Sequence, residues 1–259
     1  MGHIRLGRLP KTYKWRNVFE AIKSDELNPE ILAKAISQSA RDEFDSLKGD
    51  HSLSFCFWVL ASVVSAARTD SFVERLEKLG IKAENINSGL QFAKNIAQFI
   101  SKSLNDFGRP NAFANIAELS VNETFSSIII KQSKSLFGTT VSDIQTACKK
   151  VATKKQFGII SRQFFSTFIS RSLQFVTDKE ISNSVGKNRS ISNTTELLSF
   201  QKALSLYCYQ SSKIIEDYSG GWFSKQAWQT KNEIPYSAAK GFMAYAIEKV
   251  NMDLRGGDA

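Results

Sequence analysis

Residues of the types that most often carry catalysis are few in this chain. Its 259 residues include only two histidines, His3 and His51. A Ser–His–Asp or Cys–His site would have to use one of them as its base, and a catalytic base must be held in a fixed position. His3 lies in a basic N-terminal stretch, and His51 follows Asp50 at the expected start of a helix, where a capping or solvent-facing role is simpler. The sequence therefore predicts no general base.

Metal and redox chemistry are not indicated either. The cysteines are odd in number, far apart and without a Cys-x-x-Cys pair, so neither a zinc site nor a disulfide framework is expected. Carboxylates cluster at Asp42, Glu43 and Asp45 and again at Glu216 and Asp217, but adjacent residues on a helix point apart, which favours a solvated face. Buried, reduced thiols are the simpler expectation for all three cysteines: Cys56, Cys148 and Cys208.

Short catalytic and nucleotide-binding motifs are absent from the sequence. It contains no GxxxxGK[ST] loop that would wrap a phosphate, no GxGxxG, no HExxH and no GxSxG. We therefore expect a protein that is not an enzyme and that needs no cofactor and no metal.

Positive charge is the more informative feature. The formal net charge is +9, which suggests an acidic partner or serves solubility alone. Clustered Lys and Arg neutralise phosphates, and nearby aromatic rings can stack on bases, so nucleic-acid binding is one hypothesis. Three basic segments would make this contact. The N-terminal arm supplies Arg5, Arg8, Lys11, Lys14 and Arg16. A central segment supplies Lys149, Lys150, Lys154, Lys155, Arg162 and Arg171, and a polar loop supplies Lys187 and Arg189.

The N-terminal arm MGHIRLGRLPKTYKW has a second interpretation. Its apolar residues Ile4, Leu6 and Leu9 alternate with basic ones, which a purely electrostatic tail would not need. These residues, together with Arg5 and Arg8, are therefore predicted to dock on the body of the protein or on a partner. The arm is not a myristoylation signal, because Leu6 stands where that motif requires Ser or Thr.

Three large rings gather in the stretch EDYSGGWFSKQAW. Gly220 and Gly221 are placed to end a helix in a left-handed turn. Trp222, Phe223 and Trp228 would then lie in or after that turn, beside Lys225. Such rings either lock the last helix onto the bundle or anchor another protein, and a base-stacking platform is a further alternative. We predict a partner-binding site at Trp222, Phe223, Lys225 and Trp228.

The elements that must position these residues are helices. Apolar residues recur with helical periodicity along most of the chain, and no alternating strands or fixed-period repeats are found. The predicted fold is all-α, an irregular bundle of about 8–10 helices around one core. Start signals are expected at Asn28-Pro29, at Asn87 or Ser88, and at Thr153, and an end signal at Gly80. One long helix is predicted from 194 to about 218.

The expected organisation is a basic extended arm at 1–14, one helical domain at 15–253, and a disordered tail at 254–259, with an alternative division near 138–142. The most apolar stretch, Leu53 to Ala67, is shorter than the roughly 20 residues that a bilayer span needs. We predict a helix buried on most sides there. With neither a span nor a signal peptide, a cytoplasmic location is expected.

Four short stretches carry a resemblance to a known group of proteins. MGHIRLGRLP at the start and GGWFSK before the last helix, with LFGTT (Leu136 to Thr140) and QFG (Gln156 to Gly158) between them, resemble an uncharacterised bacterial family of helical proteins. The resemblance implies a multi-gene bacterial cluster as the setting, phage defence among the candidates. It brings with it no activity, cofactor or catalytic residue.

These observations lead to two main functional hypotheses, and an enzyme with an unrecognised helical fold stays open as a third class. The first is a non-enzymatic adaptor subunit of a bacterial cytoplasmic assembly, with other proteins of the same gene cluster as partners and the arm and the Trp222–Trp228 segment as contacts. The second is a helical nucleic-acid-binding protein that uses its basic segments on DNA or RNA. The sequence indicates no oligomeric state.

Overall fold

The computed structural model describes residues 15, 18, 28–40, 44–84, 86–108, 112–132, 139–183, 186, 191 and 193–254. Over these residues the chain is an all-α bundle around one core, as predicted, and they form no sheet. The helices are α2 (Pro29–Ser39), α4 (His51–Ala66), α5 (Phe72–Leu79), α6 (Gly89–Asp106), α7 (Ala112–Gln132), α8 (Val141–Val151), α9 (Lys154–Asn183), α10 (Thr194–Ser211), α11 (Lys213–Gln229) and α12 (Tyr236–Leu254).

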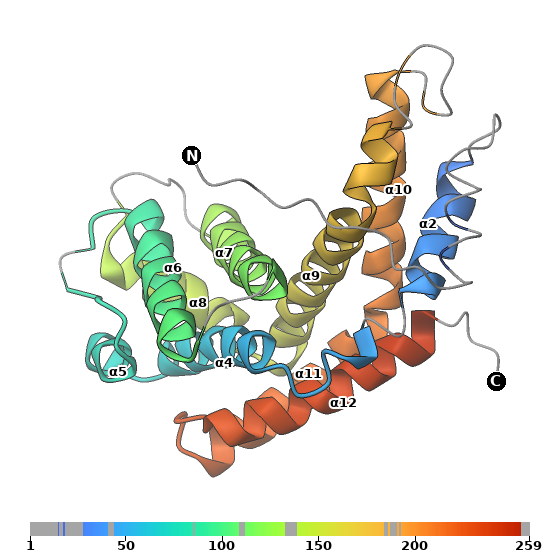
Figure 1. The fold of residues 1–259 in the computed structure, drawn as a ribbon. Coiled ribbons are helices and arrows are strands. Elements are labelled where there is room, and N and C mark those ends of the chain that lie inside the picture. The colour runs from blue at the N-terminus through green and yellow to red at the C-terminus, as the bar shows by residue number, and fades with distance from the viewer. Residues whose placement is uncertain are drawn as a thin grey trace.

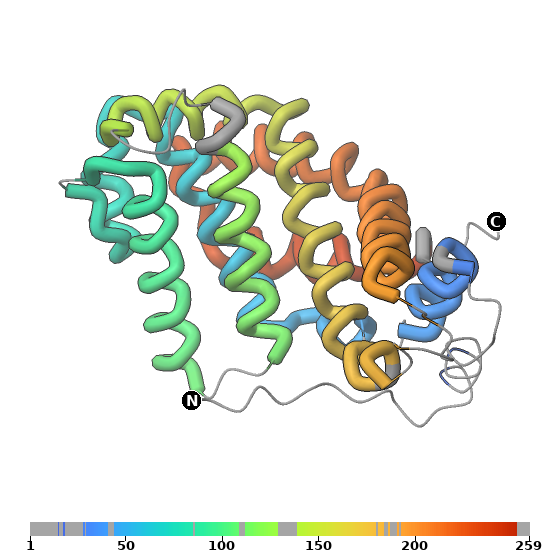
Figure 2. The backbone as a smooth tube through the Cα atoms, turned by 90° about the horizontal axis from the view of Figure 1, so that it is seen from above, coloured from blue at the N-terminus to red at the C-terminus, as the bar shows by residue number. Residues whose placement is uncertain are grey.

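One layer of the bundle is a row of helices. α6, α7, α9, α10 and α2 lie side by side in that order, each in contact with the next (Figure 2). α4, α11 and α12 run beneath the row: α4 packs on α6, α7 and α12, and α11 packs on α9 (Figure 1). α8 contacts α4, α7 and α9, and α5 lies against α4. Among the described helices, none combines the length and apolarity that crossing a bilayer would require.

α4 is the centre of the core, as its composition predicted. Helices above and below leave it little solvent, so 13 of its 16 residues are buried. Phe57 of α4 is fully buried among rings from α9, α11 and α12, with centroid distances of 5.9 Å to Phe164, 5.5 Å to Trp222 and 5.2 Å to Phe242. Since each large ring removes substantial apolar area from water, this cluster stabilises the contact between the layers.

Several predicted helix boundaries are confirmed by their hydrogen bonds. The side chain of Asn28 accepts from the backbone N–H groups of the first turn of α2, and Ser88 caps α6 in the same way. The Thr153 hydroxyl accepts from the N–H of Gln156 at the start of α9. Gly80 ends α5 with a φ of +94°, the left-handed conformation that glycine adopts without steric cost.

Two predicted boundaries in the last third of the chain are wrong. The long helix expected from 194 is interrupted at Ser212, whose N–H and hydroxyl both donate to the carbonyl of Cys208. No helix ends at Gly220 and Gly221, because α11 continues through them to Gln229. The actual C-terminal cap uses Lys231 and Asn232, both left-handed with φ of 51° and 67°. The N–H of Asn232 donates to the carbonyl of Ala227 at 2.8 Å, the long hydrogen bond of a Schellman motif.

Candidate interaction surfaces

The glycines of α9 and α11 let these two helices approach closely. A Cβ added to Gly220 would overlap the carbonyl oxygen of Lys154 and lie 3.1 Å from its carbonyl carbon. A Cβ added to Gly158 would meet the backbone of Glu216 in the same way. Residues 154 and 158 of one helix thus face 220 and 216 of the other, so the helices cross antiparallel. The stretches QFG and GGWFSK form the two sides of this crossing.

Two of the predicted partner-binding residues belong to that crossing. Phe223 is fully buried, and its ring stacks on Phe157 with 3.9 Å between centroids and 10° between planes. Trp222 is partly buried and stacks on Phe242 of α12 at 4.8 Å. Both side chains therefore lock α11 onto α9 and α12, the packing role considered from the sequence. The expectation that they lie in or after a turn is wrong, because Gly220 serves helix contact rather than chain reversal.

Arg162 is part of the same assembly and is not a free surface charge. Only 13% of its side chain is exposed. It donates to Glu216 at 3.0 Å and to the carbonyl of Tyr209 at 2.9 Å, and its guanidinium lies 3.8 Å from the centre of the Tyr209 ring. The pKa of Glu216 lies below its ordinary value, chiefly because its carboxylate accepts a hydrogen bond from Lys213. Burial raises this pKa, and Arg162 lowers it further. Arg162 therefore joins α9, α10 and α11.

Trp228 and Lys225, the other two predicted contact residues, are exposed. Trp228 has 81% of its surface accessible, more than any other exposed large hydrophobic side chain described here. Spacings of three and four residues place Tyr218, Gly221, Lys225 and Trp228 on one side of α11. Tyr218 is itself exposed, and nothing lies within 4 Å of where a Gly221 Cβ would be. This side of α11 is therefore an open stripe with rings at both ends.

α12 continues the stripe beside it. The rings of Tyr218 and Tyr245 meet edge to face at 5.3 Å, and the hydrogen bond with Tyr218 raises the pKa of Tyr245. On α12, Gly241, Tyr245 and Met252 follow helical spacing, and the space above Gly241 is open. We call the combined surface the α11–α12 face, formed by these exposed or half-buried residues of the two helices: Tyr218, Gly221, Lys225, Trp228, Gly241, Tyr245, Lys249 and Met252.

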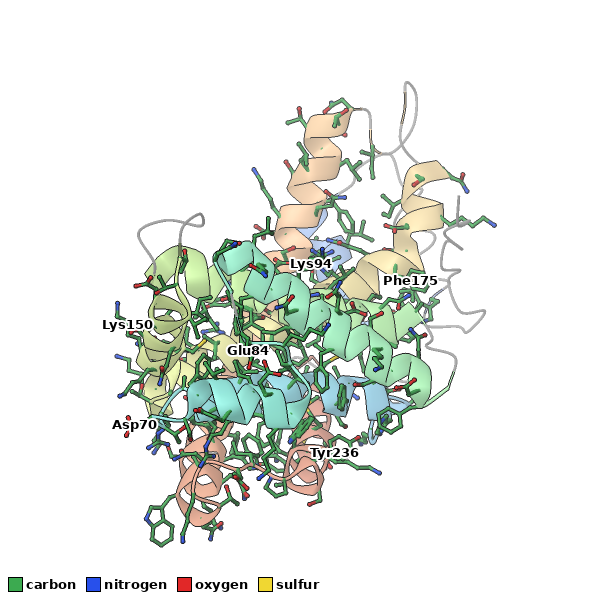
Figure 3. All side chains as sticks on the ribbon, turned by 90° about the vertical axis from the view of Figure 1, so that its left-hand side faces the viewer. Asp70, Glu84, Lys94, Lys150, Phe175 and Tyr236 are labelled. Atoms are coloured by element: carbon green, nitrogen blue, oxygen red, sulfur yellow. The ribbon has the colours of Figure 1, made fainter. Side chains whose placement is uncertain are left out.

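Four of the predicted basic residues gather at the corner between α8 and α9. Lys149 and Lys150 lie in the last turn of α8, and Lys154 and Lys155 lie in the first turn of α9. All four are exposed, and none forms an ion pair with another described residue; Figure 3 shows Lys150 at the edge of the molecule. Lys149 and Lys150 interact favourably with the negative, C-terminal end of the α8 dipole. Lys154 and Lys155 instead add positive charge at the N-terminal end of α9, which is already positive. We call these four residues the lysine corner.

Arg171 does not extend the lysine corner. It lies more than four turns along α9 and is paired with Glu123 of α7 at 2.7 Å. The other predicted site residues lie outside the described part of the chain: Ile4, Arg5, Leu6, Arg8, Leu9, Lys11, Lys14, Arg16, Lys187 and Arg189.

Asp50 and His51, two side chains of types common in catalysis, take part in helix capping and packing. Asp50 caps α4 by accepting from the N–H of Leu53, and the His51 ring packs on Phe107 while its Nδ1 lies 2.6 Å from the Tyr236 hydroxyl. No group of three His, Cys, Asp or Glu side chains suited to a metal occurs among the described residues. Burial raises the pKa of the thiols of Cys56, Cys148 and Cys208, to about 12 for Cys148 and Cys208.

Sequence reasoning missed the two tyrosines of the α11–α12 face. Tyr218 lies ten residues before Trp228, a helical spacing that would have placed both on one side of α11. The assumed helix end at Gly220 concealed this relationship. Tyr245 could be joined to them only by knowing that α11 and α12 are neighbours.

Comparison with known proteins adds no relative. No protein-family model, curated protein or solved structure matches this chain significantly. Function must therefore be inferred from the chain's own surfaces.

Proposed function

We propose that this protein is a non-enzymatic adaptor subunit of a bacterial multiprotein assembly and that the α11–α12 face is its contact surface. The observation that carries the proposal is the 81% exposure of Trp228 on a helix whose opposite side is fixed in the core by Phe223. Tryptophan and tyrosine are the residues most enriched at binding hot spots. A ring held out on a rigid helix loses little conformational entropy when a partner covers it.

The rest of the α11–α12 face suits such a contact. Gly221 and Gly241 leave its middle open, so a side chain or a helix of the partner can approach the backbone there. Lys225 and Lys249 supply positive charge at its margin, and the Lys249 ammonium lies 5.4 Å from the centre of the Tyr245 ring. The partner surface that fits is apolar in the centre with acidic residues around it.

The experiment is quantitative co-purification of a tagged chain with the products of its neighbouring genes, compared between two variants. Trp228→Ala is expected to weaken partner binding by about 2 kcal/mol, roughly thirtyfold in Kd. Leu119→Ala is the matched control, since Leu119 is an exposed side chain on α7, away from this face. Equal capture by both variants, with circular dichroism showing both folded, would overturn the proposal.

The N-terminal arm is part of the same proposal. Deleting residues 1–12 is expected to leave the unfolding midpoint unchanged and to abolish co-purification with a neighbour. A deletion variant that no longer folds would instead assign the arm to the structure of the chain itself.

The lysine corner supports a second candidate, binding of DNA or RNA. Four exposed lysines lie within a span of seven residues, and no described residue forms an ion pair with any of them, so they can release counterions from a phosphate backbone. The test is fluorescence anisotropy with labelled single- and double-stranded oligonucleotides over a salt series. Replacing Lys149, Lys150, Lys154 and Lys155 by glutamine should remove most of the salt dependence, whereas Lys94→Gln and Lys102→Gln on α6 should not. Absence of binding at low salt excludes this candidate.

A further inference from the structure

A cavity of about 360 Å³ lies between α4, α5 and the turn that joins α11 to α12. Its volume falls within the range of small-molecule sites, about 300–1,000 Å³. Its walls are mostly apolar, from Trp58 and Ala66 of α4, Leu79 of α5 and Ile234 of the turn. It is separate from the α11–α12 face and from the lysine corner, and it lies on the α5 side of the molecule, which faces the viewer in Figure 3.

Two polar groups in the lining have no hydrogen-bond partner among the described residues. Ser62 is 5% exposed, and its buried hydroxyl is unpaired. The Nη1 atom of Arg75 is also buried without a hydrogen bond, its nearest charge being the Glu233 carboxylate at 3.9 Å. Both residues line the cavity. Buried polar groups in native proteins are almost always satisfied, so these two groups call for a partner, an ordered water or a ligand, that the described residues do not supply.

The turn that closes the cavity is held in place from both sides. The Trp58 indole N–H donates to the carbonyl of Ile234 at 2.8 Å, which fixes the ring as a wall. On the α5 side, Arg75 donates to the carbonyl of Lys231 at 3.3 Å and Lys78 pairs with Glu233 at 3.2 Å. Lys231 and Asn232 of this turn carry the left-handed backbone described above, a conformation that costs side-chain-bearing residues free energy. The turn that forms this wall of the cavity is therefore fixed by the protein's own contacts.

Charge and shape define the ligand. Arg75 and Lys78 bring two positive charges and Glu233 one negative charge, so the site has a net charge of +1 and is neutralised by a monoanion. A guanidinium matches a planar carboxylate, which can accept from two donors at once. A phosphate dianion would exceed the available charge and be repelled by Glu233. We propose that this cavity binds a small apolar carboxylate, whose carboxylate accepts from Arg75 and Ser62 while its body packs on Trp58 and Leu79.

The carboxylate could belong to a free acid or to the C-terminus of a peptide, and binding experiments separate the two. The probes are phenylacetate, its neutral isostere phenylacetamide, and the chain-end mimic N-acetyl-Ala-Phe, measured by saturation-transfer NMR and calorimetry on the full-length protein. Phenylacetate should bind at least about tenfold more tightly than phenylacetamide, because a charged acceptor is lost in the amide. Tighter binding of the peptide than of phenylacetate would assign the site to chain ends, and the reverse order to free acids.

Four variants complete the test. Arg75→Gln should weaken phenylacetate binding at least about tenfold, and Glu233→Gln should strengthen it, since a negative charge is removed. Ser62→Ala should weaken binding while raising the unfolding midpoint of the free protein, because an unpaired buried hydroxyl is lost. Arg171→Gln, on α9, is the control and should change nothing. The proposal is overturned if neither acid binds at millimolar concentration, if the amide binds equally well, or if folded Arg75→Gln binds like the parent.

Discussion

Replacing Gly220 or Gly221 of α11 by alanine should change the stability of the protein in opposite directions. Gly221→Ala adds a methyl group into open space on a helix, where alanine is favoured over glycine by about 0.5–1 kcal/mol. Gly220→Ala gains the same helix propensity but drives its Cβ into the carbonyl group of Lys154. Neither backbone can yield unless α9 and α11 separate, and overpacking of this kind costs roughly 1–3 kcal/mol.

The upper end of that range applies to Gly220→Ala, because the Phe223–Phe157 stack opens when the helices separate. The net destabilisation is then about 2 kcal/mol, which lowers the unfolding midpoint by roughly 4–8 °C, whereas Gly221→Ala raises it by about 1–4 °C. Thermal and urea unfolding followed by circular dichroism measure both shifts. Gly158→Ala should behave like Gly220→Ala, and the double variant should lose less than the sum, because one separation accommodates both methyl groups. Equal midpoints for Gly220→Ala and Gly221→Ala would refute the close crossing.

Three further outcomes follow from the packing and the charges. The pKa of Glu216 is lowered in the folded state, so its carboxylate stabilises the protein above its ordinary pKa of 4.5 and this contribution is lost as the pH falls through the lower folded value. Glu216→Gln should therefore be less stable at neutral pH, with the difference in midpoint shrinking under acid. Phe223→Ala should cost about 3–5 kcal/mol in urea unfolding, whereas Trp228→Ala should change stability little. The buried thiols should react with Ellman's reagent only after unfolding, and early labelling would contradict their burial: Cys56, Cys148 and Cys208.

The sequence predicted those parts of the fold that depend on local signals. Helical periodicity gave the all-α class, and the side chains of Asn28 and Ser88 cap helices because a short polar acceptor at that position satisfies the first free N–H groups. The central helix was predicted correctly because an apolar run that lacks a polar side can only be stable when it is covered all round.

The parts that could not be predicted depend on contacts between distant residues. A glycine pair has two uses, a left-handed turn or a close helix approach, and only the position of α9 decides that Gly220 serves the second. The real end of α11 falls on Lys231 and Asn232, both in the left-handed conformation, which asparagine adopts more readily than lysine does. Hydrogen bonds from Arg75 to the carbonyl of Lys231 and from Trp58 to the carbonyl of Ile234 hold this turn in place. The same contacts build the cavity, so no local pattern could have revealed Ser62 and Arg75 as its polar lining.

The α9–α11 crossing changes what the short sequence stretches mean. QFG and GGWFSK, two of the stretches that suggested a bacterial family, meet at Gly158, Gly220 and the Phe157–Phe223 stack. Four residues of these stretches, Phe157, Gly158, Gly220 and Phe223, are required there because two helix backbones touch. Their recurrence in other proteins would therefore report the shared fold and not a shared partner. Trp228 lies outside this requirement, since neither the core nor the crossing needs its side chain. Among related chains, variation at 228 alongside a preserved crossing would therefore indicate a change of partner on an unchanged scaffold.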